Sequence, residues 1–185
     1  AYLTGYFQSE KYFKDIEDKV RSAFIFFFII WQGINGELKG RMEGYLTRIQ
    51  ESLSVAVHVR RGDYVTSSQI YGGICTESYY CAAVKHMLTF FPGAAFYIFT
   101  NDPEWAREWV PRLCGQINGI TGDRFTVVEG TREDTGYLDM FLMSRCRNYI
   151  LANSSFSWWG AWLNPSPDKK IIAPSKWFNN QDCRD

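Results

Sequence analysis

From residue 54 onward, short apolar runs rich in β-branched and aromatic residues alternate with segments of helix length. Each run is apolar enough to be covered on both faces, which is typical of strands in a parallel sheet. The predicted strands are 54–59, 96–100, 125–128, 149–152 and 170–173. The predicted helices are 39–51, 77–91, 103–114, 136–146 and 156–163. This alternation predicts an α/β domain built on an open parallel sheet.

The first fifty residues are harder to assign. The most apolar run, 23–31, is about half the ~20 residues that a membrane-spanning helix needs, so we do not expect it to cross a bilayer. We expect a buried strand or core segment there, with a patch that touches a membrane surface as the alternative. A glycine-rich stretch, 33–44, follows and is expected to be a linker or a crossover between domains. The length of 185 residues predicts one principal domain.

The charges of the chain cancel, because twenty Lys and Arg residues balance twenty Asp and Glu residues. A neutral chain has no overall field to hold a nucleic-acid backbone, so we expect no nucleic-acid partner. Any anion that the protein binds must be held locally. The five cysteines are spaced irregularly and the chain has only two histidines, so we expect no zinc site and a reducing compartment.

Polar side chains gather directly after the first predicted strand, and Asn101-Asp102 follows the second. Ligands of an open parallel sheet bind beyond the carboxyl ends of its strands. His58 and Arg60 should point to one side of the sheet and Arg61 to the other. The planar guanidinium fork suits a diphosphate. The alternative is structural, with Asp63 forming a salt bridge to one of the arginines at the strand end.

A second polar segment lies between the fourth predicted strand and the helix after it. Asn153, Ser154 and Ser155 are each candidates for the N-cap, and the free N–H groups of a helix start can bind an anion such as a phosphate. Trp158, Trp159 and Trp162 follow in the same segment. They could stack on a sugar or a base, but at helical spacing they are more often part of a packed interior.

Asp139 is the one charged residue in the first half of an otherwise apolar predicted helix. Such a carboxylate either faces solvent or is held by a specific donor. The N1–H and N2–H₂ groups of guanine, which donate side by side, would be fitting partners. Residue types alone leave the two alternatives open.

Four motifs resemble the α-1,2-fucosyltransferase family, which includes the blood-group H enzymes and bacterial relatives. The motifs are HVRRGDYV (58–65), TNDPEW (100–105), DMFLMSRC (139–146) and ANSSFSWWGAWLN (152–164). The resemblance covers nearly the whole chain. It implies a GT-B glycosyltransferase with two Rossmann-like halves that is metal-independent, inverting and without a cofactor. The implied reaction moves L-fucose from GDP-β-L-fucose to the 2-hydroxyl of a terminal galactose in a glycan acceptor.

The resemblance also implies roles for residues that the strand-end argument selected. Arg60 would contact the β-phosphate, His58 and Asp139 would lie at the guanine, and Ser154 at the diphosphate. Stabilising the departing GDP is the main catalytic task, and Arg61 and the amides near Ser154 and Ser155 would assist. We expect Asn153 to contribute to donor binding.

Asp63 is the candidate for the base that takes the proton of the acceptor hydroxyl. If it pairs with Arg61 instead, the base lies elsewhere.

The chain also departs from the family pattern. It lacks the glycine-rich strand-and-turn of the type GGLGNQMFQYA, residues 24–37 are less polar than the family pattern, and Arg147 stands where a histidine is expected. We therefore expect residues 1–50 to be a remnant of the acceptor-side domain and a crossover, and residues 51–185 to be the GDP-fucose-binding domain. The alternatives are a catalytically incomplete fragment that binds GDP or carbohydrate, and a fucosyltransferase of other regiochemistry.

The expected location depends on the source. A bacterial protein would be cytoplasmic or membrane-associated, with peripheral attachment as one option, whereas an intact animal protein would lie in the Golgi membrane.

Overall fold

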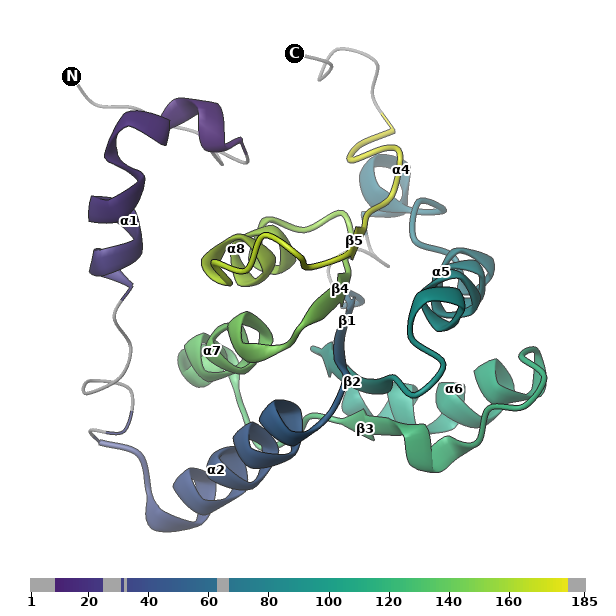
Figure 1. Ribbon diagram of the computed structural model, residues 1–185. Coiled ribbons are helices and arrows are strands. Elements are labelled where there is room, and N and C mark those ends of the chain that lie inside the picture. The colour runs from purple at the N-terminus through teal and green to yellow at the C-terminus, as the bar shows by residue number, and fades with distance from the viewer. Residues whose placement is uncertain (1–8, 25–30, 32, 63–66, 180–185) are drawn as a thin grey trace.

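The computed structural model describes residues 9–24, 31, 33–62 and 67–179, and within them five parallel strands form one sheet (Figure 1). The strands are β1 (Ser54–Val59), β2 (Ala95–Thr100), β3 (Phe125–Val127), β4 (Asn148–Ile150) and β5 (Ile171–Ile172). Their order across the sheet is β3-β2-β1-β4-β5, which puts β1 at the centre. All neighbouring pairs are parallel. The predicted α/β class with a parallel sheet is confirmed.

Helices cover both faces of the sheet, which is the middle of three layers (Figure 1). One face carries α2 (Gly36–Glu51), α7 (Gly136–Arg145) and α8 (Ser155–Leu163). The opposite face carries α5 (Glu77–Phe90) and α6 (Pro103–Gly115). The other helical segments described are α1 (Glu17–Ala23), α4 (Ser68–Tyr71) and short 3-10 turns at Glu10–Tyr12, Lys14–Ile16, Gly122–Arg124 and Glu133–Thr135.

The central strand β1 separates two hydrophobic cores, because its side chains alternate between the two faces of the sheet. Val55, Val57 and Val59 belong to the core under α5 and α6, which also contains the fully buried Trp109. Ala56 belongs to the core under α2, α7 and α8. Each large apolar side chain buried in this way contributes about 1.5–3 kcal/mol to folding. Every residue of β1 is buried, so packing on both faces fixes the position of the strand and of its carboxyl end.

The structure confirms the predicted strands and helices, with small shifts at their ends, and corrects one prediction. The glycine-rich stretch 33–44 is not a linker, because residues 36–44 form the first half of α2. Asn35 caps this helix by accepting a hydrogen bond from the N–H of Leu38 at 2.8 Å. Met42, Tyr45 and Ile49, spaced three and four residues apart, are buried against the sheet and α7. Their burial outweighs the cost of a helical glycine, which is about 1 kcal/mol.

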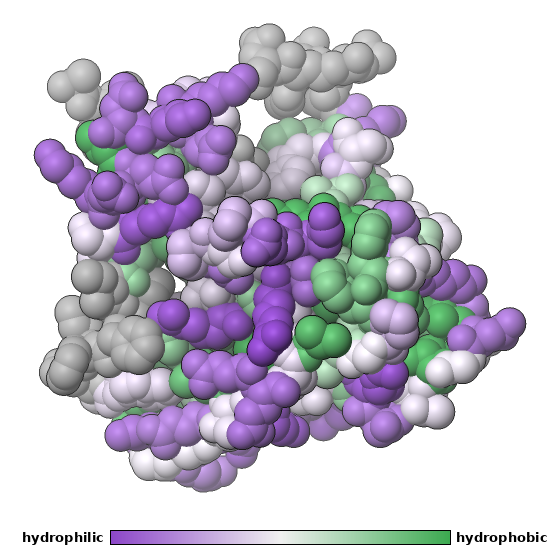
Figure 2. Space-filling model, in the orientation of Figure 1, coloured by the Kyte–Doolittle hydropathy of each residue, from purple (hydrophilic) through white to green (hydrophobic). Residues whose placement is uncertain are grey.

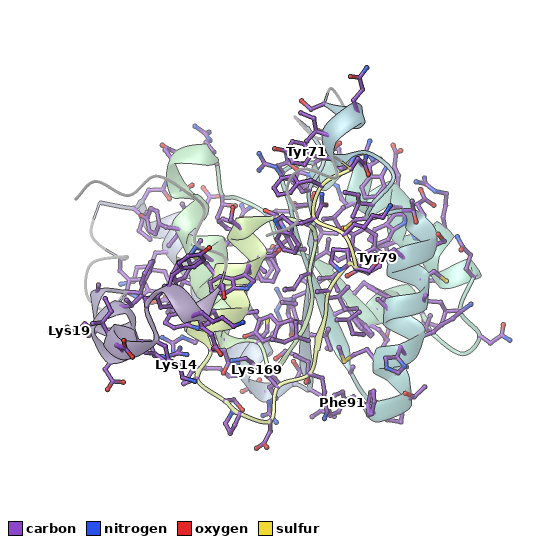
Figure 3. The ribbon with its side chains drawn as sticks, turned by 90° about the horizontal axis from the view of Figure 1, so that it is seen from above. Lys14, Lys19, Tyr71, Tyr79, Phe91 and Lys169 are labelled. Atoms are coloured by element: carbon purple, nitrogen blue, oxygen red, sulfur yellow. The ribbon has the colours of Figure 1, made fainter. Side chains whose placement is uncertain are left out.

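Side-chain hydrogen bonds fix the segment that follows β4. Tyr79 reaches from α5 toward this segment (Figure 3), and its hydroxyl donates to the carbonyl oxygen of Leu151 at 2.7 Å. The amide nitrogen of Asn153 donates to the carbonyl oxygen of Trp177 at 3.0 Å. Its amide oxygen accepts from the Cys75 thiol at 3.4 Å. The chain between β4 and α8 is thus held both by α5 and by the later C-terminal segment.

The tryptophans of α8 form the surface on which residues 9–24 pack. Phe13 stacks on Trp159 with 5.4 Å between ring centroids, and it forms a T-shaped pair with Trp162 at 5.1 Å. Phe24 also stacks on Trp159, at 5.5 Å. Trp158 meets Trp159 edge to face at 5.0 Å. Trp162 is buried, whereas Trp158 and Trp159 are half-buried, so the three tryptophans pack against residues 9–24 and do not belong to either core of the sheet.

The apolar run 23–31 lies mostly outside the described residues, which include only 23, 24 and 31 of it. Trp31 packs edge-on against Phe141 of α7, with 6.0 Å between ring centroids. In the described part of the chain, no helix is long and apolar enough to cross a membrane. On the face seen in Figure 2, polar side chains surround an apolar area between β5 and α5, and these two elements contribute the exposed side chains of Ile171 and Phe90.

Candidate functional site

The carboxyl ends of β2, β1 and β4 lie side by side, because these strands are parallel neighbours. The residues that follow them are therefore brought to one edge of the sheet: 60–62 after β1, 101–102 after β2 and 151–155 after β4. The chain continues from β1 to β2 and β3 on one side, whereas β4 and β5 lie on the other. Open α/β sheets bind ligands in the crevice at such a reversal of strand order. We place the candidate site here.

His58 is buried near the end of β1, on the α8 side of the sheet. Its ring lies 5.5 Å from the ring of Phe156 in the first turn of α8, measured between centroids. Burial, with a smaller contribution from the charge of Arg60, lowers the pKa of His58 from 6.5 to about 3, so the imidazole is neutral. Within the described residues its Nδ1 atom is buried without a hydrogen-bond partner. A buried polar atom left unsatisfied costs about 1–3 kcal/mol, and a ligand could remove that cost.

Arg60 and Arg61 follow β1 and have different surroundings. Arg60 is exposed, and its charge contributes to the lowered pKa of His58. Arg61 points toward α6, as the alternation predicted. Its Nε donates to Asp102 Oδ2 at 3.1 Å, and its guanidinium lies 4.1 Å from the ring centroid of Trp105. Asp63, the candidate base and the alternative salt-bridge partner, lies outside the described residues.

Ser154 is the N-cap of α8 and is buried. Its side chain makes no capping hydrogen bond. No hydrogen bond from the N–H groups of residues 155–157 to another described residue is present. Ser155 is partly exposed at the same end of the helix. Such a helix start, with its partial positive charge, can bind an anion. Asn153 is buried and uses its amide group to hold the C-terminal segment.

Asp139 lies in the first turn of α7 and does not face solvent. Its Oδ2 accepts a hydrogen bond from the Thr131 hydroxyl at 2.8 Å. Its Oδ1 is buried, with no hydrogen-bond partner among the described residues. Burial raises the pKa of this carboxyl from 3.8 to about 7, although the Thr131 hydroxyl opposes the shift. The solvent-facing alternative is wrong, and Oδ1 remains able to accept a hydrogen bond from a ligand.

A cavity of about 320 Å³ lies between the start of α2 and the loop 130–135. Arg41 and Glu37 line it and pair with each other at 3.1 Å. None of the predicted site residues is among its lining residues. In the described part of the chain, no group of three His, Cys, Asp or Glu residues could hold a metal ion.

Sequence reasoning missed two features of this edge. Thr131 precedes α7 in a loop, and nothing in its sequence context signals that its hydroxyl binds Asp139. The partners of Arg61 were also missed, although the sequence placed Asn101-Asp102 at the neighbouring strand end. Strand order was the missing information, because it decides which loop faces which.

A parallel α/β sheet with an arginine after its central strand and an open helix start beyond β4 is typical of α/β proteins that bind a phosphate-containing ligand at the carboxyl ends of their strands. The chain belongs to glycosyl transferase family 11, whose profile matches residues 1–184.

The curated relatives are enzymes of bacteria and animals. The chain is 33% identical over 180 residues to an alpha-1,2-colitosyltransferase of Escherichia coli, covering 96% of this chain and 56% of the relative. It is 35% identical over 127 residues to the O-antigen biosynthesis glycosyltransferase WbnK of the same species, covering 68% and 39%. It is 25% identical over 170 residues to galactoside alpha-(1,2)-fucosyltransferase 1 of Saimiri boliviensis boliviensis, covering 87% and 42%. The chain thus spans about half the length of these relatives.

Among solved structures, that of POFUT1 in complex with GDP is similar to this fold. The TM-score is 0.52 at 11% sequence identity, over 77% of this chain and 47% of that one. The similarity supports the predicted GT-B-like α/β fold.

Proposed function

We propose that this chain is the donor-binding part of an enzyme that transfers L-fucose from GDP-β-L-fucose to the 2-hydroxyl of a terminal galactose in a glycan. The observation that carries the proposal is the buried Oδ1 of Asp139 in the first turn of α7, which has no hydrogen-bond partner among the described residues. Relatives that act as α-1,2-glycosyltransferases support the reaction type.

Asp139 is proposed to read the guanine. Its carboxylate can accept from guanine N1–H and N2–H₂ together, whereas adenine and uracil do not present this pair of donors. The neutral imidazole of His58, whose Nδ1 also lacks a partner, is proposed to contribute a second polar contact. A site built for paired donors rejects a base that lacks them, because its own polar atoms then stay unsatisfied.

Arg60 and the start of α8 are proposed to stabilise the departing GDP. In the transfer step the acceptor oxygen forms a bond to the anomeric carbon of fucose, while the bond from that carbon to the β-phosphate oxygen breaks. The electron pair goes to the diphosphate, which gains negative charge. A guanidinium fork and the N–H groups of residues 155–157 are suited to that charge. Groups of this kind contribute about 10²–10³ in rate.

The proton of the acceptor hydroxyl must go to a base, and Asp63 is the residue we propose. Attack on the face opposite the diphosphate converts a β-linked donor into an α-linked product. The step is therefore inverting.

Transfer of colitose is the second candidate, because one bacterial relative, 33% identical over nearly this whole chain, carries that activity in its name. Colitose is L-fucose without its 3-hydroxyl, so the same guanine and diphosphate contacts would serve both donors. The two candidates differ only at the sugar, and parallel assays with GDP-fucose and GDP-colitose distinguish them.

The decisive experiment is a product assay with GDP-fucose and a β-galactoside, followed by assignment of the new linkage. We expect an α-1,2-linked product and release of GDP, with Arg60→Ala as the inactive control. GDP binding without turnover would favour a donor-binding fragment over an enzyme. Absence of GDP binding would contradict the proposal.

A further inference from the structure

The turn after β1 is held by a residue from the neighbouring strand. Gly62 adopts a left-handed backbone conformation, with φ of +51°. A Cβ atom at this position would lie 2.5 Å from Nδ2 of Asn101, so any other residue would displace this amide group. The other end of the same amide group, Oδ1, accepts the backbone N–H of Arg61 at 2.9 Å. Because Val59 pairs with Thr100, the last residue of β2, Asn101 follows that strand beside this turn.

The side chain of Arg61 ties the same turn to α6. The carboxylate of Asp102 is shared: Oδ2 accepts from Arg61 Nε at 3.1 Å, and Oδ1 caps α6 by accepting the N–H of Trp105 at 3.1 Å. The guanidinium also lies over the Trp105 ring. That ring stacks on Trp109, 5.2 Å away between centroids, and Trp109 is fully buried. The turn is thereby connected to the core on the α6 side.

We infer that Arg61, Asn101, Asp102 and Trp105 form a latch whose task is to position Arg60. With Arg61 fixed on the α6 side, the strand alternation directs Arg60 to the opposite side, toward His58 and α8. Arg61 is then a positioning residue and does not itself contact the donor. Asn101 fixes the backbone of the turn, and Asp102 joins the turn to the first turn of α6. The inference rests on the proposed function for the role of Arg60.

The latch can be tested first without any ligand. Asn101→Ala removes the acceptor for the Arg61 amide. Asp102→Asn keeps an oxygen to cap α6 but loses the charge that holds Arg61. We expect both variants to speed hydrogen exchange of the backbone amides at residues 59–62 at least 10-fold. Glu77→Gln, which removes the exposed ion pair with Arg112, is the matched control and should leave this exchange unchanged.

The second measurement asks whether the latch acts through Arg60. Arg61→Ala and Asp102→Asn should each weaken GDP binding about 3- to 10-fold, and the double variant should be no weaker than either single one, because both break the same contact. In an Arg60→Ala background, neither change should weaken binding further. Calorimetric titration with GDP measures all of these constants.

Two results would overturn the inference. One is a loss of GDP affinity in Arg61→Ala as large as that in Arg60→Ala with no loss in Asp102→Asn, because Arg61 would then contact the diphosphate directly. The other is unchanged hydrogen exchange in both latch variants. Failure of the proposed function looks different, since the native protein would not bind GDP while the exchange experiment would still report on the latch.

Discussion

Lowering the pH should weaken GDP binding through Asp139. In the free protein, burial raises the pKa of this carboxyl from 3.8 to about 7. If guanine donates two hydrogen bonds to the carboxylate, the bound state keeps it ionised and its pKa returns toward the ordinary value. The free protein then takes up a proton as the pH falls through about 7, and the complex does not. Affinity should therefore be full above this pH and should decline below it.

The size of the effect follows from the two pKa values. At about pH 5, two pH units below the raised pKa, about one molecule in a hundred carries the ionised carboxylate. Apparent GDP affinity should thus be about 100-fold weaker there than at about pH 8, which corresponds to about 2.7 kcal/mol. His58 does not add to this change, because its pKa of about 3 leaves it neutral throughout the range. The free energy of unfolding of the free protein depends on pH in the opposite direction. Because the pKa of Asp139 is higher in the folded than in the unfolded state, the contribution of Asp139 to stability increases as the pH falls through about 7.

The assay is calorimetric titration with GDP over this pH range, in buffers with different ionisation enthalpies. We expect the native protein to release about one proton on binding at about pH 5.5. The terminal phosphate of GDP also titrates near pH ~6, so Asp139→Asn serves as the control that shares this contribution. The variant should bind GDP weakly, lack the additional pH dependence and prefer GDP over ADP less than the native protein does. Equal pH slopes, or equal GDP-over-ADP preference in the two proteins, would refute the guanine role of Asp139.

Three further outcomes are expected. Arg60→Ala should weaken GDP binding by about 1.5–3 kcal/mol. Arg60→Lys should bind GDP little better than Arg60→Ala does, because a point charge lacks the guanidinium fork. Unchanged calorimetric affinity for GDP in Arg60→Ala would contradict the assignment. Gly160→Ala should lower the free energy of unfolding, measured in urea, by about 1–3 kcal/mol, because the new Cβ atom would lie 3.0 Å from the Cβ atom of Met143. Gly44→Ala is the control: open space surrounds this position, so the substitution should raise the free energy of unfolding by about 0.5–1 kcal/mol. Phe13→Ala should speed proteolysis within residues 9–24 by removing stacking on α8, with GDP affinity unchanged; an unaltered cleavage rate would argue against that contact.

The sequence was sufficient to predict the layered fold because local signals and tertiary contacts agree there. The stripe of Met42, Tyr45 and Ile49 and the apolar run 54–59 each carry the periodicity of the element that they form. Asp102, followed by Pro103, likewise marks the start of α6.

The candidate site was only partly predictable, because its decisive contacts join residues far apart in the chain. Asn101 meets the turn after β1 only because β1 and β2 are neighbours. Thr131 holds Asp139 through a loop conformation that no residue pattern specifies. The glycines of 33–44 have low helix propensity, which is why a linker was predicted there. In the structure this stretch forms part of α2, because burial of one face of that helix outweighs the low propensity.

The position of β1 in the middle of the sheet has a consequence for how the protein is made. Val59 pairs with Thr100, but Val57 pairs with Ile150, much later in the sequence. During synthesis β1 and β2 therefore leave the ribosome well before β4 does. Until then, the backbone N–H and C=O groups of β1 that later pair with β4 have no partner strand. Contacts so distant in sequence form slowly, and an unpaired strand flank invites association with other chains. The nascent protein must pass through this stage, and binding by a chaperone would protect it until residue 150 has emerged.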